Sequence, residues 1–448
     1  MRGLLGPREL HPEEQLRGSG GGATLGPLSS LGGGRWSAPK IALTAGVCVV
    51  AALIARDRGH GEGVGGDFHA FWQAGRNFAA GAPLYHGDLP GARRFVYPPF
   101  AAMVFQLLAI FPLPLAAEIF SFLNLALFGA TVYVTKRIVD RTNPERGGGV
   151  LPLVLAVVLS LVFVLDNFNR VQINQLIFLL ILLGIDAYLR ARDVRAAAYF
   201  VVATGIKITP VFFAIWLVLR GRGRAVWAVP AFAVGGVVAP LLWRGPATGV
   251  ADLAEYYRSF LAGFQHGQVM TDSRVQNIGA MIYRMMRPAE TSEQLAYAYL
   301  PTSERVAGLT YKLATVILLL LFLASLGVLR ARGAAVSAFE LSSVFLISHL
   351  LSPITWRAHL VTLLFVFYTV LAVRLKALPR ALRGVLVALW PLMALSAVDG
   401  RDLVGRVAYY EIAGYSVVVW TMLLLFLVAL VLTHREAVRR RPFAPLAA

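Results

Sequence analysis

The sequence predicts an all-α polytopic membrane protein, a bundle of about twelve transmembrane helices. Hydrophobic residues make up 57% of the 448-residue chain, and the mean hydropathy is +0.66. A soluble protein of this length would be more polar. Apolar runs of roughly 15–25 residues recur along most of the sequence, which is the length that a membrane-crossing helix needs. The runs are continuous rather than alternating, which excludes a transmembrane β-barrel.

The distribution of charge supports the same fold class. The net charge of +18 would suggest nucleic-acid binding in a soluble protein. Here the basic residues, almost all of them arginine, lie in short segments between apolar runs, as expected for cytoplasmic loops. The single cysteine, Cys48, lies in the first apolar run, so neither an intrachain disulfide nor a cysteine metal site is possible.

The N-terminal segment, 1–37, is rich in Gly, Arg, Ser and Pro and predicts a disordered cytoplasmic tail. A first span is expected at 41–55, with Lys40 on the cytoplasmic side. A cleaved signal peptide is the competing interpretation, but a long polar tail precedes the run and no small-residue cleavage site follows it. Residues 56–113 then form a first outer loop.

Within this loop, 99–111 is apolar but too short to cross. About 13 residues of helix reach about 20 Å, short of the ~30 Å hydrocarbon core. The next run, 114–135, ends at Lys136 and Arg137, which belong inside only if 99–111 does not cross. The segment is therefore predicted to be a juxtamembrane helix with proline in its first turn.

Residues 195–219 are long enough for one span, but arginines flank both ends. These are Arg190, Arg192, Arg195, Arg220, Arg222 and Arg224. Both ends therefore belong in the cytoplasm, and Gly205 to Pro210 supply a hinge. We expect a hairpin of two half-length helices with Lys207 at its outward tip, since broken helices are tolerated where they line a cavity.

Further spans are expected at 150–165, 173–189, 225–243, 308–329, 335–351, 358–373, 381–397 and 414–433. A second long outer loop covers 244–304. Residues 38–434 thus form one transmembrane domain, and 435–448 a basic cytoplasmic tail. Both termini are predicted to be cytoplasmic, and the protein to lie in the cytoplasmic membrane.

This topology places the unusual polar residues on the outer side: Asp67, His69, Tyr97, Gln172, Asn174, Lys207, Gln276, Arg357 and His359. Polar side chains near a bilayer are costly and usually functional, so we expect an outward-facing site. Asp67 has two interpretations that can coexist. It can cap a helix from Phe68, with Phe68, Phe71, Trp72, Gly75 and Ala79 on one face, or act as a general base.

The cationic residues suggest phosphate binding. Lys207 is either a snorkelling lysine or the counter-charge of a phosphate. Trp356, Arg357 and His359 are either interface anchors or phosphate ligands. Gln172 and Asn174 either bond neighbouring helices or contact substrate. No nucleotide-binding loop, HExxH motif or Cys/His cluster occurs, so neither metal nor cofactor is expected.

Several segments together resemble a known family. They are Gly66-Asp67-Phe68, Gly81 to Tyr85, Tyr97-Pro98-Pro99, Gln172-x-Asn174, Lys207 to Pro210 and Ser352 to Trp356. In this order the chain resembles the polyprenyl-phosphate-mannose-dependent mannosyltransferases of the GT-C superfamily, the group containing the phosphatidylinositol mannoside mannosyltransferase. Ala358 departs from the paired histidines of that family, and Val275-Gln276-Asn277-Ile278 from its Asn-Gln-Ser-Leu motif.

The resemblance implies a metal-independent, inverting transferase with a GT-C-like bundle, acting outside the cytoplasm. Asp67 would be the base. The donor would be a polyprenyl-phosphate sugar, its phosphate bound by Lys207, Arg357 and His359. Tyr97, Gln172, Asn174, Gln276 and Trp356 would contact substrate, and a lipid or glycolipid would accept mannose. The alternatives are an arabinofuranosyltransferase with the same type of donor, a transporter or flippase of lipid-linked sugars, and a non-enzymatic lipid-binding subunit.

Overall fold

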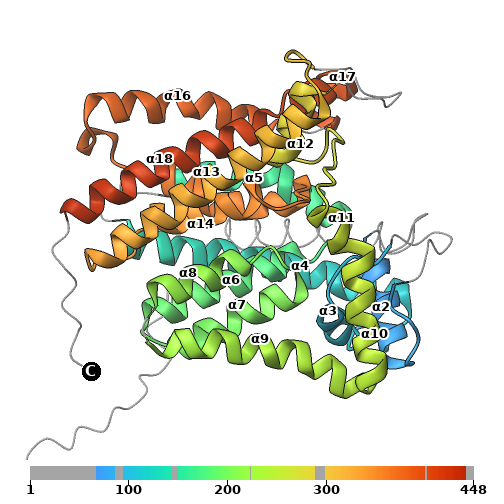
Figure 1. The fold of residues 1–448 in the computed structure, drawn as a ribbon. Coiled ribbons are helices and arrows are strands. Elements are labelled where there is room, and N and C mark those ends of the chain that lie inside the picture. The colour runs from blue at the N-terminus through green and yellow to red at the C-terminus, as the bar shows by residue number, and fades with distance from the viewer. Residues whose placement is uncertain are drawn as a thin grey trace, which may run out of the picture. The chain divides into compact units, whose positions relative to one another are not determined.

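The computed structural model describes residues 67–85, 94–143, 150–221, 223–287, 298–398 and 401–439. All regular structure in these ranges is helical (Figure 1). The tail 1–37, the first span at 41–55, Asp399 and most of the tail 435–448 lie outside the described residues, so the predictions about them are not tested.

Within the described residues, six stretches are long and apolar enough to cross a membrane. They are α4 (Leu113–Thr142), α5 (Leu151–Asn169), α9 (Gly223–Arg244), α13 (Glu304–Ala331), α16 (Arg380–Ala397) and Val407–Val438, which covers the end of α17 (Arg401–Gly414) and most of α18 (Val417–Arg439). The chain is therefore a polytopic helical membrane protein. Shorter apolar helices are α6 (Asn174–Leu189), α8 (Val211–Arg220), α14 (Ala338–Leu350) and the pair η4 (Arg357–Thr362) and α15 (Leu363–Leu371).

The short helices explain why the structure does not give the expected count of twelve. Every residue of α14, from Ala338 to Leu350, is buried, so this helix packs against protein on all sides. By contrast, α9 buries few of its side chains and α13 exposes a long apolar face. A continuous apolar run fits both situations, so length alone does not separate a core helix from a lipid-facing span.

The predicted hairpin is confirmed. α7 (Asp193–Ile206) and α8 are separated by an extended residue, Lys207, and by Ile208 to Pro210. At the tip, the Lys207 Nζ donates to Asn174 Oδ1 at the start of α6. At the opposite end, the Tyr188 hydroxyl of α6 donates to the carbonyl of Arg220. α8 therefore runs back along the path of α7, so both arginine-flanked ends lie together.

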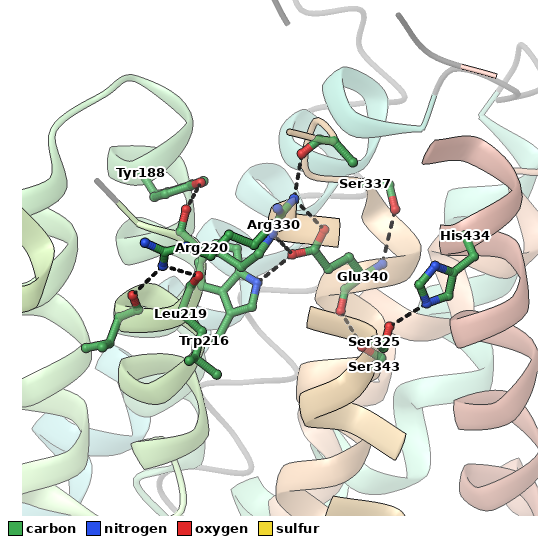
Figure 2. A network of polar contacts seen from close by, with 12 residues as sticks. Tyr188, Trp216, Leu219, Arg220, Ser325, Arg330, Ser337, Glu340, Ser343 and His434 are labelled. Atoms are coloured by element: carbon green, nitrogen blue, oxygen red, sulfur yellow. Dashed lines mark hydrogen bonds and ion pairs between the residues drawn. The ribbon is translucent and has the colours of Figure 1, made fainter. Parts of the chain in front are cut away.

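The open end of this hairpin is held by a buried ion pair, which Figure 2 shows. The Arg220 Nε lies 2.8 Å from Glu340 Oε1, with side chains 5% and 1% exposed. Trp216 Nε1 donates to the same carboxylate, and Arg220 also donates to the Ala334 carbonyl. The Ser337 hydroxyl accepts from the backbone N–H of Glu340, so α14 begins with a side-chain cap.

The segment 99–111 has the predicted form. α3 (Pro99–Phe105) is seven residues long, begins at a proline and continues only as turns. It packs on α2 (Phe68–Ala79), where the backbone of Phe105 approaches Gly75 so closely that a Cβ at Gly75 would lie 2.7 Å from it. The expected apolar face of α2 is mostly confirmed, but its last member, Ala79, is exposed and Phe78 is buried instead.

The C-terminal end of α2 is fastened by Arg244, the last residue of α9. Its guanidinium donates to the carbonyls of Asn77, Phe78 and Ala82 at 2.8–3.1 Å. It also pairs with Asp252 at 2.7 Å in α10 (Pro246–Tyr256), and its side chain is 1% exposed. The segment after α10 continues as η3 (Tyr257–Leu261), α11 (Ala262–Gln265) and α12 (Ile278–Met286), and η5 (Leu375–Ala377) precedes α16.

We predict that Glu340→Gln strongly destabilises the fold, because it leaves the buried Arg220 guanidinium without its carboxylate. Breaking a buried pair in this way typically costs about 3–5 kcal/mol. The control is Arg190→Ala, since Arg190 pairs with Asp186 while 42% exposed, and such pairs are worth at most about 1 kcal/mol. Thermal unfolding in detergent compares the two. Equal melting temperatures would contradict the prediction.

Candidate active site

A cavity of about 160 Å³ lies at the tip of the hairpin. Its walls come from the start of α2, residues 94–98, the α5–α6 turn, the α7–α8 tip, the end of α10 with η3, and residues 352–359. Most residues predicted for the site line it, namely Asp67, Tyr97, Gln172, Lys207, Trp356 and His359. Segments that lie about 300 residues apart in the sequence thus meet at one site.

Asp67 is placed by the α5–α6 turn and not by helix capping. Its backbone is helical (φ −70°, ψ −18°), and its side chain accepts no capping hydrogen bond from α2, which corrects the capping prediction. Instead, its Oδ2 accepts from Gln172 Nε2 at 2.6 Å, and its backbone N–H donates to the Arg170 carbonyl at 3.0 Å. The carboxylate is therefore aimed by a neighbouring segment.

The α5–α6 turn is strained at Val171. This β-branched residue is 1% exposed and has a φ of +50°, a backbone region that residues other than Gly, Asn and Asp rarely adopt. Such strain costs on the order of 1–3 kcal/mol and is retained mainly where the surroundings determine it. The conformation brings the Arg170 carbonyl and the Gln172 side chain to Asp67.

Lys207 lines the same cavity while only 8% exposed. Its Nζ donates to Asn174 Oδ1 at 2.6 Å, and Asn174 Nδ2 in turn donates to Asn167 Oδ1 at 3.1 Å. Within the described residues, no carboxylate forms an ion pair with this ammonium group. Asn174 lines a second cavity of about 30 Å³ behind the lysine, so it supports Lys207 and does not face the larger cavity.

Trp356 and His359 are positioned by a tight turn. The backbone N–H of Trp356 donates to His359 Nδ1 at 3.3 Å, and the His359 N–H donates to the Trp356 carbonyl. A ring nitrogen that accepts carries no proton, so this contact favours a neutral His359 protonated at Nε2. The guanidinium of Arg274 lies over the indole of Trp356, 5.3 Å from the ring centroid, and this cation–π contact helps to fix Trp356.

Arg274 is itself paired with Asp272 through Nε at 2.9 Å. Burial alone would raise the pKa of the Asp272 carboxyl, but the hydrogen bonds from Arg274 hold that pKa below its usual value. The pair is therefore charged at neutral pH, and the cation over Trp356 is retained.

Besides Asn174, two further predicted site residues, Arg357 and Gln276, do not line the cavity. The Arg357 guanidinium lies 5.0 Å from the ring centroid of Tyr409. Gln276 is fully buried, and its side chain donates to the carbonyls of Ser273 and Ala413, while its backbone N–H donates to the Thr355 carbonyl. Both residues brace the segment that carries Trp356. The sequence predicts that both residues lie near the site, but side-chain direction depends on packing that hydropathy does not encode.

Among the charged and aromatic residues of the lining, sequence reasoning missed four: Arg94, Arg170, Tyr256 and Phe260. Arg170 lies within the polar segment 166–174, and Tyr256 in a Tyr-Tyr pair of the long segment 244–304, so a signal existed for both. With Lys207, the two arginines give the lining three cationic side chains against one carboxylate, Asp67. This balance suits an anionic ligand. Burial raises the pKa of the Tyr256 hydroxyl, which therefore stays protonated.

Comparisons with known proteins support the resemblance. The model of glycosyltransferase family 87 matches residues 95–353. A Mycobacterium tuberculosis protein is 25% identical over 389 residues, covering 82% of this chain and 84% of its own length; it is named a polyprenol-phosphate-mannose-dependent α-(1-2)-phosphatidylinositol mannoside mannosyltransferase.

A second M. tuberculosis protein, named as the corresponding pentamannoside mannosyltransferase, is 31% identical over 170 residues, 38% of this chain and 37% of that protein. No solved structure gives a significant match. The family match includes the α5–α6 turn, the hairpin tip and the start of the 352–359 segment. Because this match covers more than half of the sequence, the chain belongs to glycosyltransferase family 87 and is a membrane glycosyltransferase.

Proposed function

We propose that the chain transfers mannose from a polyprenyl-phosphate donor to a lipid or glycolipid acceptor, with inversion, at the outer face of the cytoplasmic membrane. The observation that carries the proposal is the shared cavity of Asp67 and Lys207, with Gln172 bonded to one and Asn174 to the other. The names of both relatives specify polyprenol-phosphate mannose as donor, which supports the choice of sugar.

In this mechanism an acceptor hydroxyl attacks the anomeric carbon of the donor sugar. The new bond forms as the bond from that carbon to the phosphate oxygen breaks, and the hydroxyl proton passes to Asp67. Polyprenyl phosphate leaves with the bonding electron pair, so its negative charge increases in the transition state. Lys207 is the group placed to stabilise that charge, and a poorly hydrated site strengthens the interaction. Gln172 keeps the carboxylate aimed at the acceptor.

The distribution of arginines supports an outward-facing cavity. At the end of α6 opposite Asn174, Arg137 and Arg190 both pair with Asp186, and the open end of the hairpin at Arg220 lies beside them. A cluster of basic residues at one end of a helix bundle marks the cytoplasmic side. The cavity lies at the other end of the same helices. Arg94 and Arg170 would then favour an acceptor with an anionic headgroup.

This topology predicts opposite accessibility at the two ends. In a variant that lacks the native Cys48, a cysteine at Arg258, whose side chain is 68% exposed in the second outer loop, should react with an impermeant thiol reagent from outside. A cysteine at Arg332, which is also exposed but follows α13, should react only after the membrane is permeabilised. The reverse labelling pattern in intact cells would invert the proposed orientation.

The central prediction concerns Asp67. Since its side chain caps no helix, Asp67→Asn should retain the fold, and its side-chain oxygen can still accept from Gln172. It cannot take up the acceptor proton, and loss of a general base typically lowers the rate about 10²–10⁴-fold. The measurement is product formation by mass spectrometry from a panel of polyprenyl-phosphate sugars and lipid acceptors.

The control is Asp186→Asn. Asp186 pairs with Arg137 and Arg190 at the opposite end of α6 and does not line the cavity. It should retain most of the activity. If Asp67→Asn turned over at close to the wild-type rate, Asp67 would not be the base and the proposed mechanism would fail.

A further prediction concerns the donor phosphate. Lys207→Met keeps an unbranched apolar side chain one atom shorter but removes the charge, so donor affinity should fall about 10- to 150-fold, the equivalent of a hydrogen bond of roughly 1.5–3 kcal/mol to a charged group. Lys312→Met, an exposed lysine on α13, is the control. Binding of a polyprenyl phosphate without sugar isolates this contact, and equal affinities of the two variants would remove Lys207 from the donor site.

A further inference from the structure

A short π-helix, η3, interrupts the outer segment directly after α10. It spans the five residues Tyr257–Leu261. π-turns are rare, and they occur frequently at functional sites because the extra residue re-aims neighbouring side chains. Tyr256, which directly precedes this turn, and Phe260, which lies within it, both line the cavity.

The Tyr256 hydroxyl is buried and unpaired. The side chain is 7% exposed, and among the described residues its Oη has no hydrogen-bond partner. The hydroxyl groups of the two neighbouring tyrosines, by contrast, form hydrogen bonds. The Tyr85 hydroxyl donates to the Tyr97 carbonyl at 2.7 Å, and the Tyr257 hydroxyl bonds to Gln265 while 44% exposed. Leaving a buried hydroxyl unpaired is costly, which points to a partner supplied by a ligand.

The rings form a continuous aromatic wall. Tyr85 and Tyr256 have centroids 5.9 Å apart, Tyr256 and Phe260 stack at 5.8 Å with planes 21° apart, and Phe264 meets Phe260 edge-on at 5.3 Å. Aromatic faces carry partial negative charge, so they attract the polarised C–H groups on one face of a sugar ring. A hydroxyl donor beside such a face matches the mixed character of a saccharide.

We propose that Tyr256 and Phe260 form the saccharide-binding wall of the cavity, with the Tyr256 hydroxyl bonded to a sugar hydroxyl and the Phe260 ring against the apolar face of that sugar. This assignment rests on the proposed glycosyl transfer and adds to it the residues that select a sugar. The sugar is either that of the donor or that of a glycolipid acceptor, because both must reach the same cavity.

The test compares two adjacent tyrosines. Tyr256→Phe removes the hydroxyl inside the cavity, and Tyr257→Phe removes one outside it. We expect Tyr256→Phe to raise the KM of one substrate about 3- to 10-fold, the range for a neutral hydrogen bond, with a melting temperature equal to or above that of the wild type, because an unpaired buried group is removed. Tyr257→Phe should leave KM unchanged. Phe260→Leu and Phe264→Leu form the second matched pair, with the same expected contrast.

The two substrates are varied separately. A rise in the KM of polyprenyl-phosphate mannose assigns the wall to the donor sugar, and a rise in the KM of a mannosylated lipid acceptor assigns it to the acceptor. Equal KM values for Tyr256→Phe and Tyr257→Phe with both substrates would overturn the inference. The wild-type protein is assayed alongside: if it formed no product from polyprenyl-phosphate mannose with any acceptor, the proposed function would fail independently of the tyrosines.

Discussion

The cavity depends on one strained turn, in which the buried Val171 is held at positive φ between α5 and α6. One side of this turn bonds Asp67, through the Arg170 carbonyl and the Gln172 side chain. Two residues later, Asn174 bonds Lys207. The positions of Asp67 and Lys207 thus both depend on this turn, so the distance between them cannot change without altering its conformation. Strain of this kind persists only where surrounding packing enforces it.

Helices with an almost uniformly apolar sequence supply that packing. α14 is buried along its whole length, and the α7–α8 hairpin is fixed at its tip by the Lys207–Asn174 contact and at its open end by the Arg220–Glu340 pair. The hairpin brings a lysine to a poorly hydrated cavity while leaving its arginines at the opposite end. The uneven spacing of charge along this apolar run therefore matches where the chain turns and which cation reaches the cavity.

Sequence reasoning recovered the fold class, the hairpin, the short helix α3 and the convergence of most polar residues. These features follow from the lengths of the apolar runs and the positions of the arginines, both of which can be read from one sequence. It did not recover the directions of the side chains of Arg357 and Gln276, or the bond that replaces helix capping at Asp67. Those depend on contacts between distant segments, for which periodicity carries no information. Tyr256 was visible as part of a tyrosine pair, but a π-turn has no sequence signature of comparable strength.

The attachment of α2 at both ends has a consequence for catalysis. At its start, the Asp67 N–H donates to the Arg170 carbonyl, and at its C-terminal end the Arg244 guanidinium donates to the carbonyls of Asn77, Phe78 and Ala82. The helix is therefore fixed at both ends to other parts of the bundle. In the proposed mechanism, a carboxylate held at the start of such a helix needs little reorganisation when it takes up the proton, so reaching a reactive geometry depends on the movement of the substrates and not of the protein.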